Sequence, residues 1–290
     1  MANRIFCVEV GGTFTDWVLV ENGRVTKTGK VLSTPEEPAA AVMNALRGGV
    51  EDPAGLSAVI HGSTVATNAV LERKGAVTGL MTTRGFRDVL QIQRQSKSRL
   101  FDLFYRQPDP LVPRDRIVEV SERIGPRGEV WRPLELEDLA QRLGELVEHG
   151  TESMAVCLLH SYANPTHELA LSRYLEERYP RLYVTLSSEV LPRFREYERM
   201  STCTISAYVK PRVDRYLGEL ESSLSEAGFE GHLSIVQANG GSIPASEARR
   251  HAAKMILSGP AAGVIGAIAS ARASGFKDLL TIDMGGTSTD

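Results

Sequence analysis

Two segments, one near each end of the sequence, share one arrangement of residue types. Residues 9–16 read EVGGTFTD and residues 283–290 read DMGGTSTD, so both follow the pattern acidic-x-Gly-Gly-Thr-x-Thr-Asp. Each segment follows a short apolar run that is typical of a β-strand. A single glycine-rich motif is weak evidence of function, and two matched copies are much stronger. The pair therefore indicates an internal repeat with a shared chemical purpose.

The residue types of this repeat suit the binding of phosphate together with a metal ion. Two glycines after a strand allow a tight turn whose backbone N–H groups point at phosphate oxygens, and threonine hydroxyls add donors. Carboxylates are ligands that Mg²⁺ prefers. We predict that the two copies grip one nucleotide from both sides of a cleft. The predicted phosphate-binding residues are Gly11, Gly12, Thr13, Thr15, Gly285, Gly286, Thr287 and Thr289. The predicted metal ligands are Glu9, Asp16, Asp283 and Asp290.

The competing interpretation of the repeat is a pair of ordinary β-hairpins with glycine at the turn. The segments match neither the P-loop pattern GxxxxGK[ST] nor the Rossmann pattern GxGxxG. Two further positions extend the predicted site. His61 ends a predicted strand before a helix and is either a catalytic base or a hydrogen-bonded histidine beside a helix cap. Gly259 opens an Ala/Gly-rich helix and is predicted to approach the nucleotide, whereas Gly263 and Gly266 are expected to allow close helix packing.

Strands and helices alternate along the sequence in a way that would position these residues. We expect strands at residues 4–10, 16–21, 25–31, 58–61, 77–81, 153–159, 183–186, 233–236 and 279–284. We expect helices at residues 35–46, 64–73, 134–148, 165–179, 197–227 (with a break or kink at Pro211) and 258–273. Asn22-Gly23 is a strong hairpin signal, Asn239-Gly240-Gly241 favours a turn, and residues 83–133 look like a less regular insertion with extended pieces. The alternation predicts an α/β fold with a largely parallel sheet and antiparallel edges.

Composition excludes several other classes of protein. The 290 residues are 42% hydrophobic and 24% charged, with a formal charge of −3, which argues against a disordered chain and against a general nucleic-acid binder. The three cysteines are far apart, so a disulfide framework is not expected. The most apolar stretch, residues 255–271, contains Pro260 and fits a buried helix better than a membrane span. We therefore expect a cytoplasmic protein without a membrane segment.

The motifs together resemble the hydantoinase/5-oxoprolinase A-subunit family. The segments that carry the resemblance are residues 10–16, 61–75, 83–95, 187–199, 207–209, 239–241, 258–264 and 283–290. The family usually has Asp where this chain has Glu9, which leaves the role of Glu9 in metal binding open. The resemblance implies the actin/Hsp70/sugar-kinase-like ATPase fold, a ribonuclease H-like mixed sheet with flanking helices. It also implies a first domain at residues 1–190, with an insertion at about 84–133, and the start of a main domain at 198–290. Family members are longer, so we expect a chain truncated before its second lobe is complete, and inactive by itself.

The resemblance also implies a function. The family activity expected here is the ATP- and Mg²⁺-dependent hydrolysis of a cyclic amide such as a hydantoin, 5-oxoproline or another lactam, activated by phosphorylation. Asp16, Asp283 and His61 are the implied catalytic residues, and a hydantoinase B-type subunit is the implied partner in a hetero-oligomer. Three alternatives stay open. They are the ATP-using subunit of a ketone carboxylase of the acetone or acetophenone type, a sugar-kinase-like phosphotransferase, and a nucleotide-gated binding module.

Overall fold

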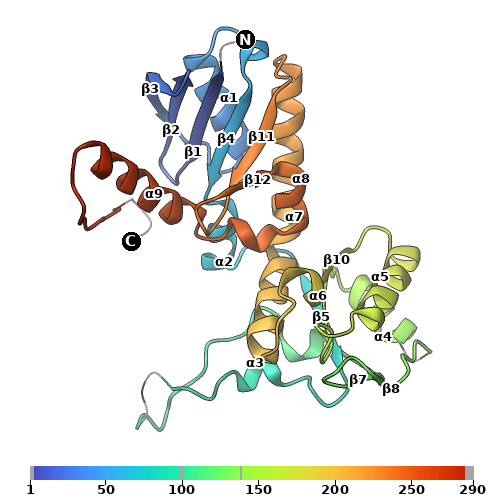
Figure 1. The fold of residues 1–290 in the computed structure, drawn as a ribbon. Helices are drawn as coiled ribbons and strands as arrows, with labels where there is room; N and C mark the ends of the chain where they lie inside the picture. Colours follow the sequence, from blue (N-terminus) through green and yellow to red (C-terminus); the bar gives the residue numbers. More distant parts are fainter. Residues whose placement is uncertain (1–2, 98, 100, 138, 285–290) are drawn as a thin grey trace. The chain divides into compact units, whose positions relative to one another are not determined.

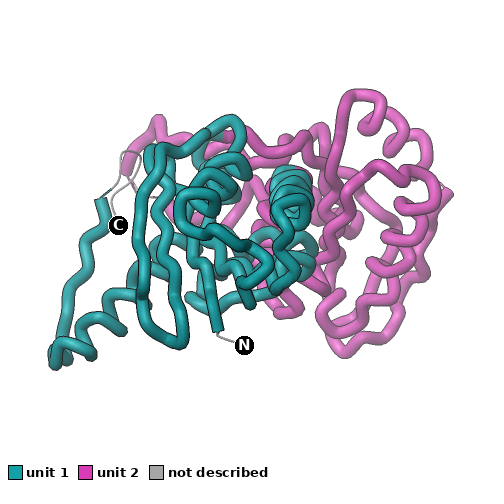
Figure 2. Tube along the Cα trace, turned by 90° about the horizontal axis from the view of Figure 1, so that it is seen from above, with its two compact units in different colours: residues 1–72, 212–290 teal, residues 73–211 magenta. Residues whose placement is uncertain are grey.

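The computed structural model describes residues 3–97, 99, 101–137 and 139–284, and the chain divides into two compact units. Unit 1 combines residues 1–72 with 212–290, and unit 2 consists of residues 73–211 (Figure 2). Strands from both ends of the chain share the sheet of unit 1. The domain bounds expected at 1–190 and 198–290 stay a prediction. The predicted glycines, threonines and aspartate at residues 285–290 lie outside the described residues.

Unit 1 is built on a six-stranded mixed sheet with the order β12-β11-β4-β1-β2-β3 (Figure 1). The strands are β1 (Arg4–Val10), β2 (Phe14–Glu21), β3 (Arg24–Leu32), β4 (Ala58–Ser63), β11 (His232–Val236) and β12 (Ser242–Pro244). β4 runs parallel to both β1 and β11, whereas β2 is antiparallel to β1 and β3, and β12 is antiparallel to β11. The predicted parallel centre with antiparallel edges is confirmed.

The hairpin between β2 and β3 turns at the predicted dipeptide. Asn22 and Gly23 both have positive φ angles, 52° and 77°, which is the backbone that a two-residue type I′ turn requires. The second predicted turn is also present, because Gly240 has φ 79° and the N–H of Gln237 donates to the carbonyl of Gly241 across it at 2.8 Å.

One face of this sheet is covered by α1 (Pro38–Gly49). Trp17 is the centre of the packing, because its ring stacks on Phe6 with centroids 5.7 Å apart and occupies the space beside Gly29 and Gly49. The helix begins at Pro38 rather than at the predicted residue 35. Thr34 instead closes a separate turn, with its hydroxyl donating to the carbonyl of Glu37 at 2.6 Å.

The remaining elements of unit 1 flank the same sheet. They are η1 (Pro53–Gly55), α2 (Val65–Leu71), α8 (Ala245–Arg250), η3 (Ala252–Met255), α9 (Ser258–Ala273) and the second half of α7 (Glu196–Glu226). The bounds of α9 match the prediction. The buried strand predicted at 279–284 is not observed. Leu280, Ile282 and Met284 are exposed there, and the described residues of this segment form a single β-bridge, at Met284, in place of a strand.

Unit 2 is a three-layer α/β/α arrangement around a parallel four-stranded sheet with the order β10-β9-β5-β6. The strands are β5 (Thr78–Thr83), β6 (Ile117–Val120), β9 (Ser153–Cys157) and β10 (Tyr183–Leu186). Leucines of α4 (Leu139–Glu148) and α5 (Thr166–Arg178) pack on one face. Leu90 of α3 (Val89–Ile92) and Met200, Cys203 and Ala207 of α7 pack on the other.

The extended pieces expected within residues 83–133 are present. One of them, β6, belongs to the core sheet, and the segment also contains η2 (Arg114–Arg116) and the hairpin of β7 (Arg123–Ile124) and β8 (Val130–Arg132). A short helix, α6 (Ser187–Val190), follows β10. α7 is continuous through Pro211, where the boundary between the two units falls. All three cysteines are free thiols, as predicted.

Candidate functional site

Glu9 and Asp16 are direct partners across the β1–β2 pair, so their side chains lie on the same face of the sheet. Their neighbours along the strands, Val8, Val10 and Thr15, are buried on the opposite face, which α1 covers. Because successive side chains on a strand alternate between faces, the two carboxylates lie on the face away from α1. The repeat motif therefore presents its acidic pair toward open space at the end of β1.

Lys30 is a charged partner for this pair that the sequence reasoning did not identify. It pairs with Asp16 across β2 and β3, and its ammonium lies 2.9 Å from the Asp16 carboxylate. The same ammonium lies 4.8 Å from the ring centroid of Phe14, within the range of a cation–π contact. Its place beside Asp16 can be predicted only once the β2–β3 register is known, because it lies 14 positions further along the sequence. The open face thus carries one cation next to two carboxylates.

The Glu9 side chain lies next to two glycines, and the absent Cβ of one of them, Gly259, leaves room for its carboxylate. Glu9 is the cross-strand partner of Gly62 on β4, and a Cβ built on Gly62 would be 3.5 Å from Glu9 Cγ. A Cβ built on Gly259, in the first turn of α9, would be 2.8 Å from Glu9 Oε1. The structure therefore brings Gly259 to a predicted metal ligand, as a residue whose missing side chain leaves room for the carboxylate.

The surroundings of Glu9 oppose the negative charge of its carboxylate. Partial burial and the neighbouring carboxylates of Asp283 and Asp16 together raise the pKa of Glu9 above its ordinary value. The first turn of α9 beside it contains no acidic residue that would add to this repulsion. A carboxylate with a raised pKa beside two others is a site that a cation would relieve. Among the described residues, however, no three His, Cys, Asp or Glu side chains converge as a ready-made metal site.

The turn at residues 11–13 has two kinds of backbone N–H group. Gly11 uses its N–H to close the turn on the Phe14 carbonyl at 3.0 Å, and the Thr13 carbonyl accepts from Ser33 N–H at 3.0 Å. Gly12 and Thr13 are exposed, and their N–H groups donate to no backbone carbonyl within the described residues. A Cβ on Gly11 would be 3.0 Å from the Phe14 oxygen, so this tight turn favours glycine. Two N–H groups at the end of β1 are therefore oriented by a fixed turn and remain available to an anion.

Thr15 and His61 are placed differently from the other predicted residues. Thr15 is fully buried on the α1 face, where its hydroxyl pairs with that of Ser33 at 2.9 Å. His61 is also fully buried, with Nδ1 3.1 Å from the carbonyl of Val8 and Nε2 within hydrogen-bond distance of the Tyr216 hydroxyl. In this structure both side chains are buried, and their contacts help to hold β1, β2 and β4 in place, while their predicted roles in phosphate binding and catalysis stay predictions.

The structure fixes the protonation of His61. Burial lowers the pKa of His61 to about 4, so the ring is neutral at pH 7. A carbonyl only accepts, so Nδ1 carries the proton toward Val8 and Nε2 accepts from Tyr216. Tyr216 lies on α7, far along the sequence, and no motif signalled it.

The helix that follows β4 begins with a chain of hydroxyl contacts. Ser63 Oγ accepts from the N–H of Val65, and Thr64 Oγ1 donates to the carbonyl of Val10 at 3.3 Å. Asn68 Nδ2 donates in turn to Thr64 Oγ1. Ser258 Oγ, at the start of α9, donates to the carbonyl of Ser63. These contacts fix α2 and α9 against the end of β1, which is where the carboxylates lie.

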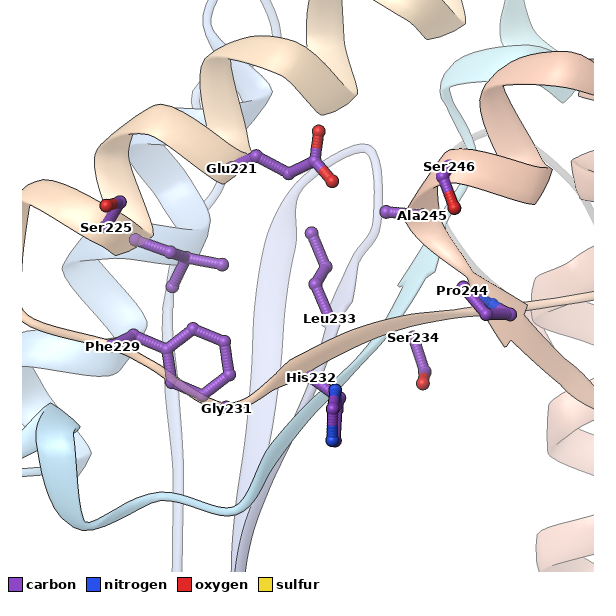
Figure 3. A pocket seen from close by; sticks show the side chains of 11 residues that line it. Glu221, Ser225, Phe229, Gly231, His232, Leu233, Ser234, Pro244, Ala245 and Ser246 are labelled. Carbon is purple, nitrogen blue, oxygen red and sulfur yellow. The ribbon is translucent and has the colours of Figure 1, made fainter.

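A pocket of about 520 Å³ lies elsewhere in unit 1, between α7, β11 and α8 (Figure 3). Phe229, Leu233 and Ala245 form apolar parts of its wall, and Glu221, whose carboxylate also bonds Arg249 at 3.0 Å, borders it. The predicted site residues on β1, β2, β4 and α9 are not among those that line it. We therefore treat the pocket as separate from the carboxylate site.

The fold and site together define a two-unit mixed α/β protein with a carboxylate pair and a glycine turn at the end of its first strand. Comparison of the sequence with family profiles matches residues 5–179 to the hydantoinase/oxoprolinase N-terminal region and residues 199–290 to hydantoinase/oxoprolinase. The chain belongs to the hydantoinase/oxoprolinase family, which confirms the resemblance seen in the motifs.

Named relatives show the range of this family. The chain is 34% identical over 325 residues to 5-oxoprolinase 1 of Arabidopsis thaliana, covering 98% of this chain and 25% of that protein. It is 32% identical over 305 residues to the acetophenone carboxylase gamma subunit of Aromatoleum aromaticum, covering 98% of this chain and 41% of that one. The crystal structure of the ATP-dependent caprolactamase from Pseudomonas jessenii matches with a TM-score of 0.86 and 31% identity, over 98% of this chain and 43% of that chain.

The chain thus spans less than half the length of the curated relatives that it matches here. Among the described residues, no helix is both long and apolar enough to cross a bilayer.

Proposed function

We propose that this chain is the ATP-binding part of an enzyme that hydrolyses a cyclic amide after activating it with ATP. The observation that carries the proposal is the Glu9–Asp16 pair on the open face of the sheet, next to the exposed N–H groups of Gly12 and Thr13. Backbone donors beside carboxylates are the combination that a metal–phosphate group needs. The family membership and the ATP-dependent caprolactamase relative support ATP as the nucleotide.

The sheet of unit 1 supports the finer assignment of the fold. The order β3-β2-β1-β4-β11, with β2 antiparallel to its neighbours, matches the ribonuclease H-like sheet of the actin/Hsp70/sugar-kinase-like ATPases that the resemblance implies. In that assignment the β1–β2 turn faces phosphates. Residues 285–290 would supply the second turn, and they lie outside the described part of the chain.

The residues present fit Mg²⁺ and nucleotide phosphates. The absent Cβ of Gly259 leaves room for the Glu9 carboxylate, whose pKa is raised by burial and by the neighbouring carboxylates of Asp283 and Asp16. We assign Asp16, Glu9 and Asp283 to holding Mg²⁺, with Asp290 proposed from the sequence alone. Mg²⁺ commonly keeps several waters and substrate phosphates as ligands, so a complete protein cage is not required. Gly12 and Thr13 then orient phosphate oxygens, and Gly259 keeps the Glu9 carboxylate in position.

The chemistry that Mg²⁺ and ATP supply when bound is transfer of a phosphoryl group to the carbonyl oxygen of the substrate, which makes that carbonyl carbon open to attack. The residues of this chain bind and orient. The Gly12 and Thr13 N–H groups hold phosphate oxygens, and the carboxylates balance the metal charge. The buried His61–Tyr216 pair holds β4 beside β1, so that Gly62 stays next to Glu9 across the two strands.

A second reaction is favoured by a specific relative. The acetophenone carboxylase gamma subunit is 32% identical over nearly the whole chain, so a ketone is the alternative substrate class. The carbonyl oxygen is the phosphoryl acceptor in both reactions. We also propose a hetero-oligomer with a hydantoinase B-type subunit, because two relatives are named as single subunits of a larger enzyme. Cyclic amide hydrolysis is the leading proposal, since 5-oxoprolinases recur among the relatives.

Phosphate release tests this proposal. The protein in its full natural length, with its B-type partner, is mixed with Mg²⁺–ATP and a panel of hydantoins, 5-oxoproline, larger lactams, and ketones with bicarbonate. Release with one cyclic amide is the expected result. Release only with a ketone moves the protein to the carboxylases, and equal release with and without every substrate overturns both reactions.

A paired variant links the activity to the site. Asp283→Asn should abolish substrate-dependent phosphate release. The matched control Asp278→Asn changes an exposed carboxylate outside the proposed site and should leave release unchanged. Full activity in Asp283→Asn, with the circular dichroism spectrum of the native protein, would remove Asp283 from the site.

A further inference from the structure

Residues 93–110, which we call the arm, form a long excursion from unit 2 (Figure 1). No helix or strand is assigned among the described residues of this segment. The arm is attached at both ends. Near its start, Arg94 forms a two-pronged ion pair with Glu198 of α7, at 2.7 and 2.6 Å. Near its end, the carbonyl of Asp109 accepts from Arg73 at 2.6 Å. Loops of this length without regular structure are uncommon in compact domains and are usually functional.

The tip of the arm is an ordered turn around Asp102. The Asp102 side chain accepts from the N–H of Phe104 at 2.9 Å, and its backbone carbonyl accepts from the N–H of Tyr105 at 3.3 Å. The backbone N–H of Asp102 donates to the carbonyl of Arg99 at 3.3 Å. These contacts shape the tip before any partner binds, which lowers the entropy lost on binding.

The tip presents three large apolar side chains. Phe101 is 93% exposed, Leu103 is 94% exposed and Phe104 is 90% exposed. Each aromatic side chain of this kind buries roughly 150–250 Å² when covered. Exposed apolar patches of more than a few hundred Å² mark interaction sites on soluble proteins. Three such side chains on four consecutive positions are therefore a contact surface.

The charges around the tip indicate which kind of partner it would bind. Lys97, Arg99 and Arg106 are exposed, and Asp102 is the one acidic residue between Lys97 and Arg106. An apolar tip with a basic surround complements an apolar pocket with a carboxylate rim. A symmetric contact with a second copy would bring two basic arms together, which like-charge repulsion opposes.

We infer that the arm docks a different protein subunit, which receives Phe101, Leu103 and Phe104 in an apolar pocket rimmed by carboxylates. This inference rests on the hetero-oligomer of the proposed function. It adds the surface that makes the contact and the chemistry of its counterpart.

The test measures assembly of the full natural chain with its B-type subunit. Binding is followed by isothermal titration calorimetry and by analytical ultracentrifugation. The triple variant Phe101→Ser/Leu103→Ser/Phe104→Ser should lose at least 100-fold in affinity. The matched control Val130→Ser/Trp131→Ser removes exposed apolar side chains from strand β8, elsewhere in unit 2, and should bind as the native chain does. The variant Lys97→Glu/Arg106→Glu should weaken binding and reduce its dependence on salt.

Each other outcome overturns the inference in an identifiable way. Equal affinity of the arm variant and the native chain removes the arm from the interface and leaves the proposed function intact. If the native chain does not bind the B-type subunit, the proposed partner is wrong. Nucleotide binding by the native chain is measured separately and still tests the proposed function. Arm-dependent binding to vesicles with 30% anionic lipid, without subunit binding, would assign the arm to a membrane surface instead.

Discussion

The Tyr216 hydroxyl donates a hydrogen bond to Nε2 of His61 in the interior of unit 1, across 155 positions of sequence. The other ring nitrogen of His61 donates to the Val8 carbonyl at 3.1 Å. One imidazole therefore connects α7, β4 and β1. Burial raises the pKa of Tyr216, so its hydroxyl keeps the proton that it donates. The strands that place Glu9 and Gly62 are thus fixed by a polar contact on the opposite face of the sheet.

Removing this hydroxyl should destabilise unit 1. Tyr216→Phe leaves Nε2 of His61 buried without its donor, and an unsatisfied buried polar atom typically costs about 1–3 kcal/mol. Urea unfolding followed by circular dichroism measures the free energy of unfolding. Tyr105→Phe removes an exposed-loop hydroxyl that bonds Gln107 at 3.3 Å and should change little. A Tyr216→Phe protein as stable as the native one would show that the contact contributes nothing.

Acidification should weaken the fold through the same histidine. Burial lowers the pKa of His61 to about 4, below the ordinary value of 6.5, so the unfolded chain takes up a proton that the folded chain refuses. The contribution of neutral His61 to the free energy of unfolding is therefore fully present above pH 6.5 and is lost as the pH falls toward 4. Between pH 7 and pH 5 this loss should be about 2 kcal/mol. Unfolding of His61→Asn at both pH values should show a smaller loss, since that side chain does not titrate, and an equal loss would contradict the prediction.

Neutralising Glu9 should have opposite effects with and without metal. Partial burial, and to a smaller extent the neighbouring carboxylates of Asp283 and Asp16, raise the pKa of Glu9, so its charge opposes folding at neutral pH. Without metal, Glu9→Gln should raise the melting temperature at pH 7, and the gain should vanish below the ordinary carboxyl pKa. With millimolar Mg²⁺ the native chain should gain stability and Glu9→Gln should gain little. Equal Mg²⁺ responses of the two proteins would exclude Glu9 from the metal site.

Lys30 should compete with a metal ion for Asp16. Its ammonium lies 2.9 Å from the Asp16 carboxylate in an exposed pair. Such pairs contribute about 0.2–1 kcal/mol, so Lys30→Met should raise Mn²⁺ affinity by up to about fivefold. Electron paramagnetic resonance of free Mn²⁺, without nucleotide, measures this affinity. The control Lys27→Met removes a neighbouring exposed charge of β3. An equal rise of Mn²⁺ affinity in both variants would show that the effect comes from net charge alone.

A single methyl group at the start of α9 should disturb the site without harming the fold. Gly259→Ala places a Cβ 2.8 Å from Glu9 Oε1, so the carboxylate must move, whereas a Cβ at Gly263 meets no described atom within 4 Å. Both variants should change stability by less than about 1 kcal/mol. Only Gly259→Ala should lose at least tenfold in Mg²⁺–ATP affinity by calorimetry. The same affinity in both variants would show that Glu9 does not need its present position.

The sequence predicted the elements whose signals are local. β1, β2, β3 and α9 follow from alternation, from Asn22-Gly23 and from the Ser-Gly-Pro start. The start of α1 was wrong because the second proline, Pro38, opens the helix while Thr34 closes its own turn. The bounds of β6 and its place in the core sheet were not predicted because its four residues stand among arginines and prolines, and only its pairing with β5 identifies it. Pro211 did not break α7, and near it the Tyr208 carbonyl bonds the N–H of Ala76 from outside the helix.

Part of the candidate site could be predicted from the sequence, again because its signals are local. Glu9, Asp16 and Gly12 lie together because they belong to one hairpin, which a motif records. Lys30 and Tyr216 needed the register of β3 and the path of α7, so no pattern in the sequence identifies them. The burial of Thr15 could not be predicted from the motif, because its face of the strand is set by where α1 packs, as Trp17 shows.

The path of the chain through unit 1 also sets an order of folding. β4 and β11 are neighbours in the sheet, yet the chain between residues 72 and 212 forms the whole of unit 2. During synthesis unit 2 is complete before β11 exists, while β1 to β4 wait with an unpaired edge. Once unit 2 folds, the Ala76–Tyr208 hydrogen bond of 2.9 Å joins the two ends of the long connection. The loop that β11 must close then becomes short, which lowers its entropic cost. Folding of unit 2 therefore shortens the connection across which β11 pairs with β4.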